Sequence, residues 1–209
     1  MKKGLALLVC ALLAACALSL CSCNTLSELQ NAVKYPDAYT LSYEVTDSEG
    51  TVTTVTKTVD ADGNVYYKDE TKEAVYILDG SSYVAYQKNA EGVFERLADS
   101  KLSKKAVEAE TAGIDTYAQE SKMQFMPTAK QESDAEMLGR TVHVYKLGVG
   151  SESTGSYHYY YVDKETGICL GIEVKNAALG QNLPHDGEGF VCVEFETENV
   201  QSVLDMIEQ

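Results

Sequence analysis

The sequence predicts an α+β protein that is mostly antiparallel β, with one large curved sheet and helices covering one face. Three observations predict this fold class. The chain contains 14 tyrosines and no tryptophan, and tyrosine together with frequent Thr and Val favours half-buried pleated surface. Turn signals such as Asp79-Gly80 separate short apolar runs at the spacing of β-hairpins. Helical patterns appear only at the two ends and in the middle of the chain.

The first 22 residues have the pattern of an export signal. Lys2 and Lys3 precede an uncharged apolar run from Gly4 to Leu20, and small residues and cysteines follow it. This pattern resembles a bacterial lipoprotein signal, in which a cysteine receives the lipid at the cleavage point. We therefore expect residues 1–22 to be removed and Cys23 to be lipidated. The protein is then extracytoplasmic, in the cell envelope, and lipid-anchored to a membrane.

Two alternatives remain for this segment. Cys16 follows Leu13-Ala14-Ala15 and matches a lipoprotein box better by letter, but cleavage there would leave apolar residues 17–20 at the start of the mature chain. A transmembrane anchor is the other alternative. Against it, the apolar run is at the lower limit of a spanning helix and no stop-transfer charges follow. Cys23 uses the whole apolar run and is followed at once by polar residues.

Residues 23–209 have the length of a single domain that can bury a sizeable core without metals or disulfide bonds. The net charge of the whole chain is −15, and removal of Lys2 and Lys3 makes it −17. Such a charge argues against nucleic acid as a partner and disfavours anionic headgroups. We expect a monomer whose lipid attaches it to the membrane.

The first half of the domain is expected to begin with a short helix and to continue as hairpins. Thr25-Leu26-Ser27-Glu28 has the form of a capping box, and Tyr35-Pro36 ends the helical pattern. From Tyr39 the period changes to two, which indicates a strand. Turn residues then separate further strands, predicted at residues 51–59, 65–68, 74–78, 82–87 and 93–97.

A helical insertion at about residues 100–138 is expected to interrupt the strands. Residues 100–121 are rich in Lys, Ala and Glu, with Gly113 as a helix stop, and residues 132–138 are expected to add a helical turn. Strands are predicted again at residues 141–147, 156–162, 168–175 and 189–196. The chain ends in a helical stripe capped by Asn199, consisting of Val200, Val203, Leu204 and Ile207.

One stretch carries a family resemblance. Residues 159–168, Tyr-Tyr-Tyr-Val-Asp-Lys-Glu-Thr-Gly-Ile, lead through a strand and a glycine-bearing loop into the strand that begins near Phe190. This resembles the closing part of the lipoprotein-localisation-factor (LolA-like) fold of outer-membrane lipoprotein carriers and mycobacterial glycolipid-binding lipoproteins. The resemblance implies a half-barrel whose concave face, lidded by helices, holds acyl chains. It implies no catalytic residues.

No pattern in the sequence predicts catalysis. The motifs HExxH, GxSxG and CxxC do not occur. Residues 60–64, Asp-Ala-Asp-Gly-Asn, lack the third acidic ligand and the distal Glu of a calcium loop, so a hairpin turn is expected there. His143 and His158 lie on neighbouring predicted strands, where packing is the more common role. We expect no enzyme activity, no cofactor and no metal.

Besides the predicted anchor Cys23, Cys169 and Cys192 are the only cysteines that follow the signal segment. If the strands 168–175 and 189–196 form a hairpin centred near residues 180–181, the two cysteines lie opposite each other on one face. We predict a disulfide between them in an exported protein, with two thiols as the alternative.

Fold class and anchor together predict a binding protein. Several predicted strands are apolar on both faces, as at Tyr66-Tyr67, which fits a sheet that is covered on both sides or wrapped around a cavity. We expect a neutral or zwitterionic lipid, or another hydrophobic ligand, in the concave face. The alternative is a non-catalytic envelope interaction or scaffold module with a filled core. The ligand-binding residues predicted for the first hypothesis are Tyr39, Leu41, Tyr43, Val142 and Val144.

Overall fold

The computed structural model describes residues 33–47, 49–120, 130–149, 155–176, 181–183 and 189–207. Cys23, the signal segment and the helix predicted from Thr25 lie outside these residues. No helix in the described ranges has both the length and the hydropathy needed to cross a membrane.

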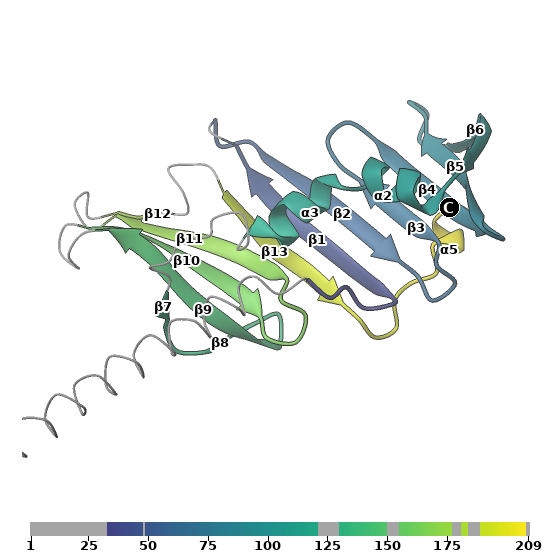
Figure 1. Ribbon diagram of the computed structural model, residues 1–209. Helices are drawn as coiled ribbons and strands as arrows, with labels where there is room; N and C mark the ends of the chain where they lie inside the picture. The colour runs from purple at the N-terminus through teal and green to yellow at the C-terminus, as the bar shows by residue number, and fades with distance from the viewer. Residues whose placement is uncertain are drawn as a thin grey trace, which may run out of the picture.

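The described strands form one large, open, curved antiparallel sheet, which confirms this part of the predicted fold class (Figure 1). Its order is β6-β5-β4-β3-β2-β1-β13-β11-β10-β9-β7, and β12 and β8 pair with β11 and β9 off this path. The N-terminal strands are β1 (Tyr39–Thr46), β2 (Val52–Val59), β3 (Val65–Lys68), β4 (Glu73–Asp79), β5 (Ser82–Lys88) and β6 (Phe94–Leu102). The others are β7 (Lys130–Gln131), β8 (Ala135–Met137), β9 (Arg140–Val149), β10 (Ser156–Asp163), β11 (Cys169–Asn176), β12 (Gln181–Leu183) and β13 (Gly189–Glu196).

The first and last strands meet near the centre of the sheet. β1 pairs with β2 on one side and with β13 on the other, where a register shift lies between Ser42 and Tyr43. This pairing joins the hairpins β1–β6 to the hairpins β9–β11 as one sheet. Because β1 has neighbours on both edges and helices on one face, Leu41 and Tyr43 are 0% exposed.

Two short helices pack against one face, α2 (Lys104–Glu110) and α3 (Gly113–Ala118) (Figure 1). The Ser103 hydroxyl accepts a hydrogen bond from the Ala106 N–H at 3.2 Å and thereby caps α2. Val107 of α2 and Ile114 of α3 are buried in the same core cluster as Leu41. α3 contacts β2 and β11, and α2 contacts β5. That helices cover the whole face stays a prediction.

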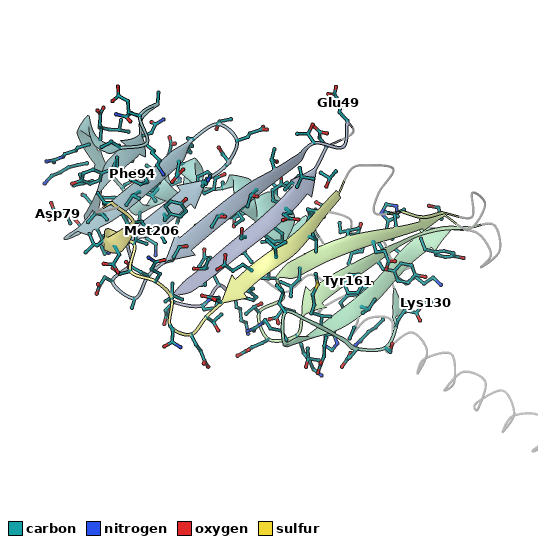
Figure 2. The ribbon with its side chains drawn as sticks, turned by 180° about the vertical axis from the view of Figure 1, so that it is seen from behind. Glu49, Asp79, Phe94, Lys130, Tyr161 and Met206 are labelled. Carbon is teal, nitrogen blue, oxygen red and sulfur yellow. The ribbon has the colours of Figure 1, made fainter. Side chains whose placement is uncertain are left out.

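The opposite face explains the adjacent tyrosines of β3. Tyr67 points to the helix side and is buried in the core, whereas Tyr66 lines a pocket with Phe94 and Met206. Figure 2, seen from behind, shows Met206 near Phe94 on this side, where helix α5 (Leu204–Ile207) lies. Side chains on both faces of β3 thus have neighbours, which come from different elements on the two sides.

The helical insertion is smaller than predicted. Residues 100–102 belong to β6, because Leu102 pairs with Tyr83 and Lys101 with Val84 of β5, and this pairing satisfies backbone groups that a helix would otherwise satisfy. Gly113 begins α3 instead of ending a helix. α2 ends at Glu110, and the Thr111 N–H bonds to the Val107 carbonyl at 3.0 Å.

Residues 132–138, predicted as a helical turn, contain β8 instead. Leu138 and Gly139 have φ angles of 52° and 71°, and Met137 pairs directly with Arg140. A two-residue hairpin with positive φ at both central positions has type I′ geometry. Leu is uncommon in this conformation, which is why the residue pattern does not indicate a turn here.

The C-terminal helix is also shorter than predicted. It comprises only Leu204–Ile207, and Asn199 has a φ of 57° in a non-helical segment. The Val203 N–H donates to the Asp60 carboxylate at 3.0 Å, so a side chain distant in sequence holds the residues before the helix. Val203 is buried, as expected from the stripe, but Leu204 is 45% exposed.

Candidate functional site

The candidate site is a pocket of about 550 Å³ between the sheet and the two short helices. This volume is within the range of small-molecule sites. Apolar and aromatic side chains supply much of its wall, and polar side chains enter from both sides. The residues that line the pocket include Tyr35, Tyr39, Lys57, Val59, Val65, Tyr83, Lys104, Val107, Glu108 and Asp115.

Strand register brings Tyr39 and Lys57 to the same face. Tyr39 pairs with Val59 and Leu41 pairs with Lys57 across β1 and β2. Directly opposite residues share a face, and so do residues two apart on one strand, so Lys57 is the diagonal neighbour of Tyr39. Diagonal neighbours are within reach of long side chains, which allows both polar ends to enter one pocket.

Lys57 is the least expected residue of the site. It is only 8% exposed, and burial lowers the pKa of its ammonium below the ordinary value, although the Asp115 and Glu108 carboxylates oppose this shift. No hydrogen bond or ion pair joins its Nζ to another side chain in the part of the chain that the structure describes. Among the described residues no fully buried side-chain nitrogen or oxygen lacks a hydrogen bond, so the Lys57 Nζ keeps some contact with the solvent in the pocket. Its partial desolvation is not offset by an ion pair.

Tyr39 is the second polar group without a close partner. Its side chain is 4% exposed and its ring stacks on Tyr35 at 5.3 Å between centroids. Burial, with Asp115, raises the pKa of the Tyr39 hydroxyl well above its ordinary value, so this group is a neutral donor. Among the described residues, none accepts a hydrogen bond from it.

Asp115 is already engaged by another tyrosine. The Tyr35 hydroxyl donates to the Asp115 carboxylate, and burial together with this hydrogen bond raises the pKa of Tyr35. Asp115 is the carboxylate whose charge acts most strongly on the pKa of Lys57, and one of its oxygens already accepts a hydrogen bond from Tyr35. The pocket thus combines apolar walls with one ammonium and one hydroxyl that can still donate.

Of the five predicted ligand-binding residues, only Tyr39 lines this pocket. The Tyr43 ring packs against Tyr117 of α3 and Phe190 of β13, at 5.6 Å from each between ring centroids, and its hydroxyl donates to the Cys169 carbonyl at 2.7 Å. Leu41 is fully enclosed in the same cluster. The groove predicted over these two residues is therefore filled by the protein's own side chains.

Val142 and Val144 lie in β9, in the other half of the sheet. They are 0% and 8% exposed, and Val142 packs in a cluster that includes Ala135 and Met137. Neither valine lines any of the three pockets found among described residues. Val142 belongs to the same core cluster as Tyr39, but β13, β11 and β10 lie between β1 and β9, and neither valine lines the pocket that Tyr39 lines.

Cys169 and Cys192 are both thiols in this structure, which is the alternative to the predicted disulfide, and the disulfide itself stays a prediction. Residues 174–176 of β11 form their hairpin with β12, and Gly171 then pairs with Val191. The predicted hairpin needs Cys169 opposite Cys192, so this register is shifted by one residue. Each thiol instead donates to a carbonyl of its own strand, and burial raises the pKa of the Cys192 thiol to about 12.

The histidines do not form a joint site. His143 pairs with Val162 across β9 and β10, and His158 pairs with Leu147, so they are four residues apart along the strands, roughly 13 Å. The His143 Nδ1 lies 2.8 Å from an Asp134 carboxylate oxygen. Within the described ranges no group of His, Cys, Asp and Glu side chains has the arrangement of a metal site.

Comparisons with known proteins give fold-level likenesses to solved structures. The chain is similar to a LolA superfamily protein from Nitrosomonas europaea, with 10% identity, a TM-score of 0.27, and coverage of 89% of this chain and 96% of that one. It is also similar to an outer membrane lipoprotein-sorting protein domain from Vibrio parahaemolyticus, with 6% identity, a TM-score of 0.25, and coverage of 90% and 95%. A third is a DUF1329 family protein from Desulfovibrio piger, with 10% identity, a TM-score of 0.23, and coverage of 87% and 92%.

The first two neighbours carry the family names that the residue pattern of this chain resembles. No protein-family model and no curated protein matches the sequence. TM-scores this low leave the superpositions too loose to transfer a ligand or a site.

Proposed function

We propose that this protein is a non-catalytic, lipid-anchored, extracytoplasmic binding protein that holds an amphiphilic ligand in the pocket between α2, α3 and the sheet. The observation that carries the proposal is the pocket itself. It has a volume of about 550 Å³ and combines Val59, Val65 and Val107 with two buried donors, Tyr39 and Lys57. Apolar walls bind an alkyl or ring system through burial of apolar surface, and a few placed polar groups orient it.

The anchor is the second part of the proposal. A basic start, an apolar run and Cys23 support export and lipidation, and a lipidated monomer would hold the pocket close to a membrane that supplies amphiphiles. Cys16 remains the alternative acceptor of the lipid.

One observation favours a different function. The centre of the helix-side face is packed by Leu41, Tyr43 and Ile114, and Val191 and Val193 of β13 are each 40% exposed. This arrangement suits a scaffold module that binds a protein partner through its sheet and no small ligand. The two functions differ in whether the pocket takes up an amphiphile.

Photo-crosslinking tests the proposal. The full chain in its own membranes is exposed to palmitic acid and hexadecanol analogues that carry a diazirine and an alkyne, and labelled peptides are mapped. We expect at least one probe to label peptides that line the pocket. Val59→Phe, which adds bulk to the pocket wall, should reduce this labelling severalfold.

Val52→Phe is the matched control, because Val52 lies on the same strand, is 56% exposed and does not line the pocket. It should leave the labelling unchanged. Absence of labelling by both probes, or equal labelling of both variants, would reject the pocket and leave the scaffold function.

A further inference from the structure

The pocket contains two hydrogen-bond donors that have no acceptor among the described residues. The Lys57 ammonium and the Tyr39 hydroxyl belong to side chains that are 8% and 4% exposed, and they enter the pocket from diagonal positions on β2 and β1. Their nearest charged neighbours do not satisfy them, since Asp115 accepts from Tyr35 instead. Carboxylates also line the pocket, but among the described residues none of them accepts a hydrogen bond from Lys57 or Tyr39, so a ligand that supplies acceptor oxygens can bind these two donors.

We infer that the ligand is an amphiphile with a single carboxylate, which Lys57 and Tyr39 bind together. This inference rests on the proposed function, because it assigns the chemistry of a ligand in the same pocket. An ammonium and a phenolic hydroxyl donate to a carboxylate in charge-assisted hydrogen bonds, which are stronger than neutral ones. The carboxylate in turn provides the partner that the buried ammonium lacks.

The charged side chains around the pocket favour a ligand with one negative charge over a ligand with two. Asp37, Glu108 and Asp115 also line it, against the two ammonium groups of Lys57 and Lys104. Only Lys57 is buried, whereas Lys104 lies on the exposed side of α2. A phosphate dianion would bring a second negative charge that no further buried cation offsets, and the net charge of −15 would repel it more strongly.

The apolar part of the ligand has a separate place. Val59 and Val65 on the sheet, Tyr83 on β5 and Val107 on α2 line the same pocket and present no charge. An alkyl chain that lies against them removes apolar surface from water, while the carboxylate stays at the two donors. The neutral or zwitterionic lipid expected from the net charge is therefore replaced by a monoanion, because Lys57 offers one mostly buried ammonium that no described side chain pairs with.

The test compares two probes on two variants. In membranes that contain the full chain, the palmitic acid analogue should label pocket peptides at least about tenfold more efficiently than the hexadecanol analogue, since a hydrogen bond to a charged group is lost with the alcohol. Lys57→Met keeps the length of the side chain and removes its charge, and it should abolish this preference. Tyr39→Phe should weaken it by a smaller factor.

A stability measurement separates binding from a structural role. Without ligand, Lys57→Met should raise the midpoint of thermal unfolding by about 2–4 °C, because it removes a charge that desolvation disfavours in the folded protein. Lys101→Met, on an exposed lysine of β6 outside the pocket, is the control and should change neither labelling nor midpoint.

The outcomes separate the two proposals. If acid and alcohol label the pocket equally and Lys57→Met changes neither, the pocket binds amphiphiles but the carboxylate inference is overturned. If Lys57→Met lowers the unfolding midpoint and both probes still bind, Lys57 is a structural residue and the inference is again overturned. If neither probe labels the pocket, the proposed function fails together with the inference.

Discussion

At the residue scale, burial of charge is handled in two opposite ways. Asp163 has a side chain that is 2% exposed, and it accepts hydrogen bonds from Arg140 at 2.7 and 3.2 Å and from the backbone and hydroxyl of Thr166 at 2.8 and 2.6 Å. Lys57 is similarly enclosed but has no such partners among the described residues. The first arrangement stabilises the fold, whereas the second is the one that we propose to be completed by a ligand.

The Asp163 cluster predicts a pH-dependent loss of stability. Burial alone would raise the pKa of Asp163, but the hydrogen bonds from Arg140 and Thr166 lower it below the ordinary value. A depressed folded-state pKa stabilises the protein above the unfolded pKa of about 4, and this stabilisation is lost as the pH falls through the folded value. Asp163→Asn should therefore cost about 3 kcal/mol at pH 7 and clearly less near pH 3.

Urea unfolding of the full chain at both pH values measures this difference. Glu165→Gln is the control, because Glu165 also contacts Arg140 but its side chain is 83% exposed, and it should cost less than about 1 kcal/mol. An Asp163→Asn penalty that is the same at pH 7 and pH 3 would show that the charge of Asp163 does not contribute.

The face of the sheet on which a side chain lies was predictable where the alternation of residues along a strand decides it. Alternation from Tyr39 correctly indicates that Tyr39, Leu41 and Tyr43 lie on the covered face. The same alternation over Val55, Lys57 and Val59 would have indicated a lysine on an apolar face, a signal that sequence reasoning missed. That α3 fills the space over Leu41 depends on tertiary packing, which no local pattern reports.

At the element scale, the hairpins were predictable because their turns carry a local signature. The Asp60 carboxylate accepts hydrogen bonds from the backbone N–H groups of Asp62 and Asn64 at 3.0 and 2.9 Å, and Gly63 supplies a φ of 81°. The turn at Leu138-Gly139 lacks an Asp or Asn side chain of this kind. Residues 100–102 have a helical composition, but they pair with β5 and form a strand. Strand and helix propensities therefore fail where a neighbouring strand decides the conformation.

Asp60 also connects two distant elements. Its second carboxylate oxygen accepts from the Val203 N–H and from the Asn64 side chain, both at 3.0 Å, so the turn after β2 holds the segment before α5. Asp60→Ala should reduce the free energy of unfolding by about 1–3 kcal/mol, because Val203, Asn64 and Asp62 lose their acceptor. Hydrogen exchange should accelerate at Val203 and in α5.

Hydrogen-exchange mass spectrometry measures this effect by segment. Asp62→Ala is the control, since Asp62 lies in the same turn and its side chain is exposed. It should leave exchange at Val203 unchanged. Exchange that accelerates equally in β10, far along the sheet from this turn, would indicate general destabilisation and contradict the specific contact.

At the scale of the whole molecule, the proposed pocket lies in one half of the sheet, while one core cluster extends through both halves. All residues that line the proposed pocket come from positions 35–119. β7 to β13 form the rest of the described sheet, and a second cluster lies around Tyr145, Tyr160 and Cys169. Pairing of β1 with β13 joins the halves. The curved antiparallel sheet was predictable from hairpin spacing, but the position of the pocket at one end of it was not.

The most direct test of the account is native mass spectrometry of the full chain recovered from its own membranes without added lipid. We predict a species with one non-covalent ligand per chain, which fragmentation identifies as a monocarboxylate amphiphile, and which Val59→Phe loses while Val52→Phe retains it. The covalent mass of the same sample should correspond to a chain that begins at Cys23 and carries acyl groups. A wild-type chain recovered with no ligand, or with a ligand that Val59→Phe retains in full, would contradict the pocket as the functional site.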